Sequence, residues 1–167
     1  MYFNKKENFE TYLVEKKELQ VVDLFLENLK LTNLDLYGVS TKTIIKNCEF
    51  TNCDLQGLEI SDSIISSSKF LNCNFYKVIF SSSTINKTVF DNCDLTRACF
   101  TNSILNTCII SNCTLRSTEF PEIVLKNVNF DKNKEVKIYK PNWVIKDCFI
   151  NSQNLVDNFP TDEWYLS

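Results

Sequence analysis

Large apolar residues recur at every fifth position through most of the chain. From residue 45 to residue 130, all eighteen positions at this spacing carry Ile, Leu or Phe. A period of five fits neither the 3.6-residue period of a helix nor the two-residue alternation of a simple strand. It predicts a chain that turns a corner every five residues and sends one large side chain inward from each short side. The positions are Ile45, Phe50, Leu55, Ile60, Ile65, Phe70, Phe75, Phe80, Ile85, Phe90, Leu95, Phe100, Leu105, Ile110, Leu115, Phe120, Leu125 and Phe130.

A second column lies two positions before the first and holds mainly small residues, most often Cys, Ser or Thr. The other three positions of each five are mostly Asn, Ser, Thr, Asp and Lys. We therefore expect each side to bury one large and one small side chain and to turn the remaining three outward. The small column consists of Thr43, Cys48, Cys53, Leu58, Ser63, Ser68, Cys73, Val78, Ser83, Thr88, Cys93, Ala98, Ser103, Cys108, Cys113, Thr118, Ile123 and Val128.

A longer repeat gives the number of sides in one coil. The segment TNCDL at Thr51–Leu55 returns as LNCNF, DNCDL and SNCTL, each twenty residues after the one before. One coil is therefore four sides of five residues. An earlier copy, TNLDL at Thr32–Leu36, precedes Thr51 by nineteen residues. We interpret the missing residue as a frame slip around residues 37–43, and expect regular coils from about residue 22 to residue 132.

The alternation of a central Leu or Phe with a small residue two positions earlier, as in TNCDL and DNCDL, resembles the pentapeptide-repeat superfamily. The resemblance covers roughly two-thirds of the chain. It implies an all-β protein with a right-handed quadrilateral β-helix, here of about five to six coils. Cys, Ser and Thr stand at most of the small positions where the family usually has Ala.

The two ends of such a rod expose backbone groups that need caps. We expect residues 1–21 to form the N-terminal cap. A helix there would place Phe9, Tyr12 and Leu13 on one face with Asn8 as its N-cap, and a short strand would fit nearly as well. The β-helix would then span residues 22–132.

The five-residue period lapses after Phe130 and resumes at Ile145. We expect a loop insertion at residues 133–144, followed by a final partial coil and a C-terminal cap at residues 145–167. The cap region is rich in aromatic residues, which could either cover the last coil or form a homodimer interface. These residues are Trp143, Phe159, Trp164 and Tyr165.

The composition makes most enzyme classes improbable. The chain has no histidine, the residue used most often as a general base, and only two glycines, too few for a phosphate-binding loop. No cluster of a nucleophile and a base is visible either. We expect a protein that is not an enzyme and that needs no cofactor.

The net charge of −3 suggests neither direct nucleic-acid binding nor a strongly acidic protein. No apolar run is long enough to cross a bilayer, and the first residues mix charges throughout, unlike a secretion signal. We therefore expect a cytoplasmic protein without membrane contact, in which the cysteines are reduced.

Seven of the eight cysteines, all but Cys99, lie in the small inward column. Cysteines stacked in single file cannot converge tetrahedrally on zinc, and their parallel Cβ vectors disfavour disulfides. We expect the thiols to act as small buried apolar groups and to bind no metal.

Two sets of outward residues are candidates for partner binding. One side of the rod carries Glu59, Asp62, Glu119 and Glu122 without Lys or Arg on that side, which could be an acidic docking face or only solvated charge. The next side carries Lys87 and Lys126 without an acid. It also aligns Ile64, Ile104 and Val124, which could be an apolar stripe for another protein or a consequence of strand propensity.

The leading hypothesis is a non-enzymatic protein-interaction module. The resemblance extends it to the pentapeptide-repeat proteins that protect DNA gyrase from quinolones or peptide toxins, in part by presenting a DNA-like rod. Gyrase or another topoisomerase would then be the partner, with a role in antibiotic resistance or toxin immunity. The alternative is a structural adaptor, spacer or secreted effector subunit of a larger assembly.

Overall fold

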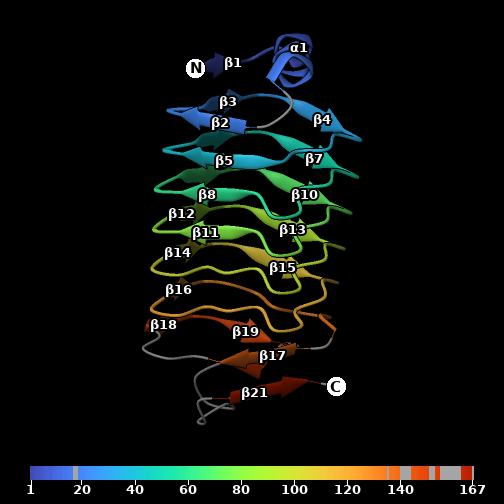
Figure 1. Ribbon diagram of the computed structural model, residues 1–167. Helices are drawn as coiled ribbons and strands as arrows, with labels where there is room; N and C mark the ends of the chain where they lie inside the picture. The colour runs from blue at the N-terminus through green and yellow to red at the C-terminus, as the bar shows by residue number, and fades with distance from the viewer. Residues whose placement is uncertain (17–18, 135, 140–143, 151–152, 155–162, 167) are drawn as a thin grey trace.

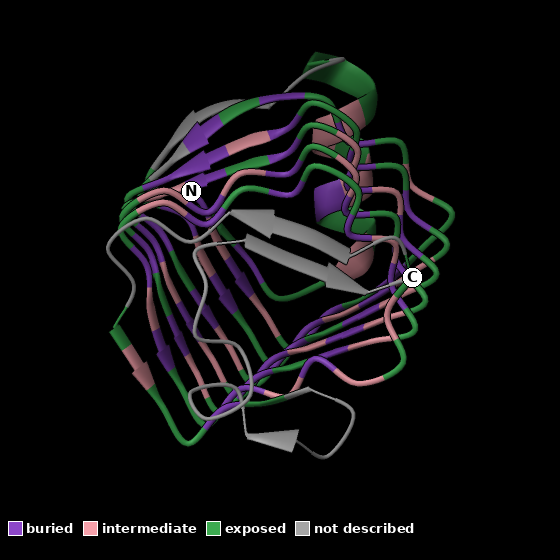
Figure 2. Ribbon diagram, turned by 90° about the horizontal axis from the view of Figure 1, so that it is seen from below, coloured by how far each residue is buried: buried purple, intermediate pink, exposed green. Residues whose placement is uncertain are grey.

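The computed structural model describes residues 1–16, 19–134, 136–139, 144–150, 153–154 and 163–166. The chain winds into a rod of stacked coils, with one helix at the N-terminal end and a small antiparallel sheet at the other (Figure 1). Seen along the rod, successive coils superpose on a four-sided outline along which buried residues alternate with more exposed ones (Figure 2). This all-β solenoid of about six turns confirms the predicted fold class.

Side I of the rod is an eight-stranded parallel sheet that runs its whole length. Each strand pairs with the strand one coil further on, so that Ile64 lies beside Thr84 and Thr84 beside Ile104. The strands are β1 (Tyr2–Phe3), β3 (Phe25–Glu27), β6 (Ile44–Lys46), β9 (Ile64–Ser66), β12 (Thr84–Asn86), β14 (Ile104–Asn106), β16 (Val124–Lys126) and β18 (Val144–Lys146).

The other three sides follow in chain order. Side II is formed by β4 (Lys30–Thr32), β7 (Glu49–Thr51), β10 (Lys69–Leu71), β13 (Val89–Asp91) and β15 (Ile109–Ser111). Side III is held by single bridges that link Asp35, Asp54, Asn74, Asp94, Thr114 and Lys134 in sequence. Side IV is formed by β2 (Leu19–Val22), β5 (Gly38–Thr41), β8 (Glu59–Ser61) and β11 (Ile79–Ser81), and it continues through bridges at Cys99 and Glu119.

A residue with positive φ closes each side. Among the described residues, twenty-two non-glycine residues have φ between 49° and 60°, and twelve of them are Asn or Asp. These two residue types tolerate the left-handed region best, which explains why the outward positions are so rich in them. At the end of side III the corner is a hydrogen-bonded turn, with the Leu58 N–H donating to the Leu55 carbonyl at 3.1 Å. Gly57 (φ 69°) stands there at the position of a type II turn that favours glycine.

The large inward column fills the interior with stacked rings. Phe50, Phe70 and Phe90 stack with centroids 4.8 and 5.1 Å apart, close to the strand spacing of roughly 4.8 Å. Phe80, Phe100 and Phe120 form a second stack on side IV. Because each coil repeats the same inward position, one residue type can stack on itself along the rod.

The small inward column is buried throughout, as predicted. Its hydroxyl and thiol groups satisfy backbone atoms: the Ser103 hydroxyl donates to the Phe80 carbonyl at 2.7 Å and accepts from the Ser83 N–H at 3.1 Å. The Cys113 thiol accepts from the Cys93 N–H in the same way. Buried polar groups need such partners. The substitution of Cys, Ser and Thr for Ala therefore adds hydrogen bonds to the inside of the rod.

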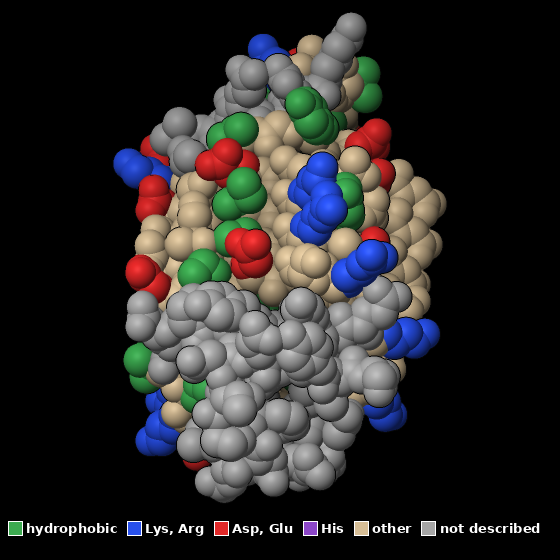
Figure 3. All heavy atoms as spheres, turned by 60° about the horizontal axis from the view of Figure 1, so that its bottom comes forward, with side chains coloured by type: hydrophobic (Ala, Val, Ile, Leu, Met, Phe, Trp, Pro, Cys, Tyr) green, Lys and Arg blue, Asp and Glu red, His purple; other side chains and the backbone are tan. Residues whose placement is uncertain are grey.

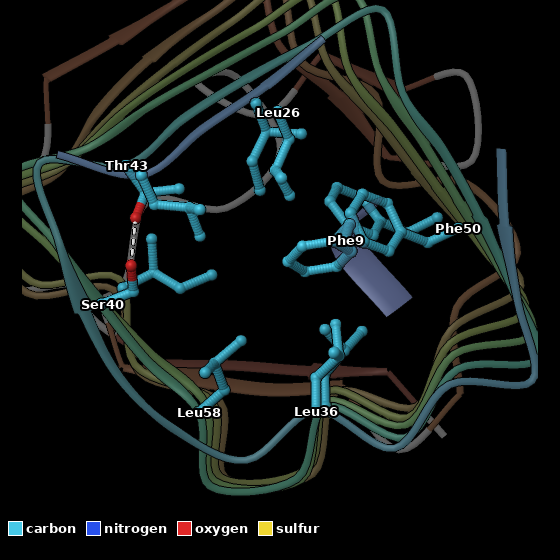
Figure 4. A pocket seen from close by; sticks show the side chains of 12 residues that line it. Phe9, Leu26, Leu36, Ser40, Thr43, Phe50 and Leu58 are labelled. Atoms are coloured by element: carbon cyan, nitrogen blue, oxygen red, sulfur yellow. Dashed lines mark hydrogen bonds between the residues drawn. The ribbon is translucent and has the colours of Figure 1, made fainter. Parts of the chain in front are cut away.

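The predicted frame slip is confirmed, and it consists of one side with four residues in place of five. Ser40 occupies the large inward position opposite Ile60, only four residues after the inward Leu36. Its hydroxyl hydrogen-bonds to that of Thr43 at 2.5 Å. Because serine is much smaller than the Ile or Phe found elsewhere in this column, a cavity of about 20 Å³ remains between Leu36, Leu58 and Phe9 (Figure 4).

The N-terminal residues combine a strand with a helix. β1 adds to the first edge of side I, and α1 (Lys6–Lys16) lies over the end of the rod. Phe9 is completely buried, and Tyr12 and Leu13 pack partly against the same core. The prediction of Asn8 as the N-cap is wrong. The helix begins at Lys6, and the Phe9 N–H bonds to the Lys5 carbonyl, so Asn8 lies within the first turn.

At the C-terminal end the chain turns back on itself. β19 (Phe149–Ile150) pairs antiparallel with β20 (Gln153–Asn154), and β17 (Val136–Tyr139) pairs antiparallel with β21 (Glu163–Leu166). The segment expected to be a loop, residues 133–144, thus contains a strand. Of the aromatic residues predicted to cap the rod or mediate a dimer, Trp143 and Phe159 lie outside the described residues. Trp164 and Tyr165 belong to β21.

Candidate interaction surfaces

The interior of the described rod is lined mainly by apolar side chains. In the described part of the chain, no group of three or more His, Cys, Asp or Glu side chains could hold a metal ion. The cavity under the helix is lined mainly by apolar side chains and is large enough for about one water molecule. The candidate sites are therefore the outward columns.

The cysteines are mainly buried thiols that hydrogen-bond to the backbone. All but Cys99 are buried, and none forms a disulfide in the described chain. The Cys73 thiol donates to the carbonyls of Leu71 and Phe50 at 3.4 and 3.5 Å. Burial raises the pKa of Cys108 to about 11, because the apolar surroundings disfavour the thiolate. Cys108 is therefore a poor nucleophile and a poor metal ligand at neutral pH.

The four predicted acidic residues lie on side IV or at its corner with side I, but this part of the rod is not uniformly acidic. Glu59 and Glu119 lie in one outward column, where they alternate with the exposed Val39 and Ile79 and with Cys99. Asp62 and Glu122 stand at the corner towards side I.

Basic residues lie beside these acids, and sequence reasoning did not assign them to this part of the rod. Since Thr41 pairs with Ser61, Lys42 occupies the corner position one coil before Asp62. Lys77 and Arg97 occupy the corner between sides III and IV, in the two coils where side IV has no acid. Side chains of both charges consequently appear on the face seen in Figure 3. The sequence could have shown this, because each of these basic residues stands two positions after an inward residue, at the corner between two sides.

Side III carries a further group of carboxylates that the sequence analysis missed. Asp35, Asp54 and Asp94 occupy one outward ladder, interrupted by Asn74, whose amide donates to Asp54 at 3.0 Å. The Asp54 and Asp94 side chains also accept bonds from the backbone N–H two residues on, which stabilises the turn. These acids therefore have a structural role in the corner.

Side I carries an apolar stripe, which we define as the outward column at the first position of each strand. The sequence identified Ile64, Ile104 and Val124, and the structure places them in one line. The register extends this line in both directions, so that seven of its eight residues are apolar. The stripe consists of Tyr2, Phe25, Ile44, Ile64, Thr84, Ile104, Val124 and Val144.

The stripe is accessible along its length. Tyr2, Ile64, Ile104 and Val144 are exposed, and the others are half-buried. Tyr2 stacks on Phe25 with centroids 5.0 Å apart. The spacing of nineteen or twenty residues could have identified Phe25, Ile44 and Val144 from sequence alone once the frame slip had been placed.

The stripe has charged residues along both borders. On the border towards side IV stand Asp23, Asp62 and Glu122, with Lys42. On the border towards side II stand Lys46, Lys87, Lys126 and Lys146, with Glu27 and Asp147. Lys46 and Glu27 form an ion pair at 2.9 Å, which lowers the pKa of Glu27. The two borders thus differ in net sign.

A four-sided parallel solenoid with a filled interior and ordered outward columns belongs to the class of solenoid repeat proteins. Residues 43–120 match the family model described as a pentapeptide repeat region. The chain belongs to the pentapeptide-repeat proteins.

The fold is shared with a solved structure, and further solved structures align over much of the chain. A pentapeptide repeat protein, Rfr23 from the cyanobacterium Cyanothece 51142, aligns with 83% of this chain and 98% of its own at 16% identity and a TM-score of 0.60. QnrB1, a plasmid-mediated fluoroquinolone resistance protein, aligns with 76% of this chain and 67% of its own at 16% identity and a TM-score of 0.47. HetL from the cyanobacterium Nostoc sp. strain PCC 7120 aligns with 87% and 94% at 12% identity and a TM-score of 0.32.

No curated protein sequence matches the chain significantly. None of the helices in the described residues has the length and apolar character required to span a bilayer.

Proposed function

We propose that this protein is a non-catalytic interaction module that binds another protein through the apolar stripe of side I. The observation that carries the proposal is the continuity of the stripe, in which seven of eight outward positions along the whole rod are apolar. An exposed apolar patch that is long and bordered by charge is typical of a protein-binding surface.

Strand propensity alone does not account for the stripe. β-Branched residues favour strands, but the side II strands β4, β7 and β10 carry Lys30, Glu49 and Lys69 at the same outward position. On side IV it alternates between apolar and acidic residues. The strands therefore accept polar residues at this position. In the described coils, side II has only Val89, Ile109 and Phe149 as apolar residues there, so the nearly continuous apolar series of side I supports a docking role.

The test is a pull-down with tagged protein from its native host. A double variant, Ile64→Lys with Ile104→Lys, should lose the partner that the unchanged protein retains. The matched control is Ile79→Lys with Ile109→Lys, because these isoleucines are 40% and 44% exposed, compared with 47% and 42% for Ile64 and Ile104. Equal recovery with both double variants would contradict the proposal.

A narrower form of the function assigns DNA gyrase or another topoisomerase as the partner, contacted through side IV in the cytoplasm. It is supported by the four carboxylates that lie on this side or at its corner with side I, Glu59, Asp62, Glu119 and Glu122. A protein that imitates DNA must present negative charge at the places where the topoisomerase binds the DNA phosphates. Lys42, Lys77 and Arg97 interrupt that charge, so the apolar stripe has the stronger physical support.

Gyrase supercoiling in the presence of purified protein tests this narrower form. Reversal of Glu119 and Glu122 to Lys should abolish inhibition or protection, and added salt should weaken the effect by screening. If the unchanged protein leaves gyrase unaffected at low salt, the role of structural adaptor or spacer in a larger assembly is favoured instead.

A further inference from the structure

The two borders of the apolar stripe carry net charges of opposite sign. The border towards side IV has Asp23, Asp62 and Glu122 with one lysine, Lys42, and so carries a net charge of −2. The border towards side II has Lys46, Lys87, Lys126 and Lys146 with Glu27 and Asp147, and so carries a net charge of +2. Each border is therefore complementary to the other, and a second copy of the chain carries both.

We propose that the stripe binds a second copy of this chain, face to face, with a two-fold axis parallel to the rod. The proposal rests on the stripe being a docking surface and names the partner that its charges fit. A two-fold axis along the rod lays the acidic border of each copy against the basic border of the other. An axis across the rod would lay acid against acid and base against base.

This symmetry also fixes the heights at which residues meet. Rotation about the rod direction leaves every coil at its own height, so each stripe residue meets its equivalent, as in any isologous contact. Glu122 and Lys126 flank Val124 in one coil. Glu122 of each copy consequently lies opposite Lys126 of the other, which gives two equivalent ion pairs.

The remaining charges are compatible with this pairing. Asp62 precedes Ile64 and lies opposite Ser66 and Ser67 of the second copy, with Lys46 one coil before and Lys87 one coil after. Asp23 lies opposite Glu27 and Lys42 lies opposite Lys46, but Glu27 and Lys46 compensate each other in an ion pair.

The size of the face predicts a weak dimer. Eight strands at a spacing of roughly 4.8 Å and a side of about four residues give a face of roughly 34 by 13 Å. The contact would bury roughly 900 Å² over both copies, near the lower limit for specific interfaces. We expect a reversible dimer with a dissociation constant on the order of 10 μM.

Sedimentation velocity of the full chain from about 1 to about 200 μM is the first measurement, and it should show a monomer–dimer equilibrium in this range. Glu122→Lys and Lys126→Glu should each weaken dimerisation about tenfold, since each creates two like-charge contacts. An equimolar mixture of the two variants should dimerise as well as the unchanged protein, because the lysine introduced in one copy then meets the glutamate introduced in the other. Lys132→Glu, at an exposed corner away from side I, is the charge-matched control and should have no effect.

The outcomes separate the alternatives. A chain that stays monomeric at about 200 μM, or a mixture that dimerises no better than either variant alone, overturns the proposed pairing. Dimerisation that is unchanged by Glu122→Lys and Lys126→Glu but is lost when residues 163–167 are removed would place the contact at the C-terminal end. That result also overturns the proposed pairing. If the chain is monomeric but the pull-down still loses a different protein with Ile64→Lys and Ile104→Lys, the docking function stands and only the second copy is wrong as the partner.

Discussion

The inward and outward columns of the rod differ in how strictly their residue types are constrained. Inward positions repeat Ile, Leu, Phe and small residues with almost no exception, because each is enclosed by its equivalents one coil away. Outward positions range from Asp to Ile, and the same place in the coil is apolar on side I and polar on side III. The comparison indicates that the inward residues determine the stability of the rod, and that the outward residues are free to carry the binding role that we propose for the apolar stripe.

The largest expected effect concerns an inward ring. Phe90 is completely buried and contacts the rings of Phe70, Phe75 and Phe80. Phe90→Ala should lower the free energy of unfolding by about 3–5 kcal/mol, since it removes a stacked ring and leaves a cavity. Phe149, which is 39% exposed on the outside, is the matched control, and Phe149→Ala should cost less than about 1 kcal/mol. Urea unfolding of both variants measures the difference.

The next effect depends on pH. The pKa of Cys108 is about 11 in the folded chain, compared with 9.0 for an ordinary thiol. Above pH 9 the unfolded chain loses this proton while the folded chain keeps it, so stability is complete below pH 9 and falls as the pH rises to 11. The loss from this thiol should be about 2–3 kcal/mol.

Urea unfolding at about pH 8 and about pH 11 tests the alkaline loss. Cys108→Ala should reduce the fall in stability, whereas Cys99→Ala, on the outside, should leave it unchanged. A fall of the same size in both variants would mean that other groups cause it.

A smaller effect is expected at the four-residue side. Ser40→Ala leaves the buried Thr43 hydroxyl without its bond to Ser40 and should cost about 1–2 kcal/mol. Ser40→Ala combined with Thr43→Val removes both hydroxyls and should cost less than the sum of the single changes. Thermal unfolding of the three variants gives this coupling, and strict additivity would show that the two hydroxyls do not act as a pair.

Sequence reasoning predicted the inside of the rod well because burial there imposes a strict period. The twenty-residue coil, the small column and the one-residue slip near Ser40 all followed from that period. Asn8 failed as an N-cap because the burial of Phe9 at the end of the rod outweighs a local capping preference in placing α1.

The outside was harder to predict, because a corner residue belongs to neither flat side. Lys42, Lys77 and Arg97 were therefore not placed beside the acids of side IV. The carboxylates of side III were missed for a related reason, since they stand in a repeat motif that is defined by its inward residues. The four-residue side also explains why Phe25, nineteen residues before Ile44, was not assigned to the stripe.

The most direct test of the account compares Ile104→Lys with Ile109→Lys. Both isoleucines are outward, they are 42% and 44% exposed, and they lie on adjacent sides of the same coil. Both changes should alter the free energy of unfolding by less than about 0.5 kcal/mol. Sedimentation velocity at about 100 μM should then show loss of the dimer for Ile104→Lys and retention of the dimer for Ile109→Lys. Equal association of the two variants at equal stability would contradict the claim that side I is the binding surface.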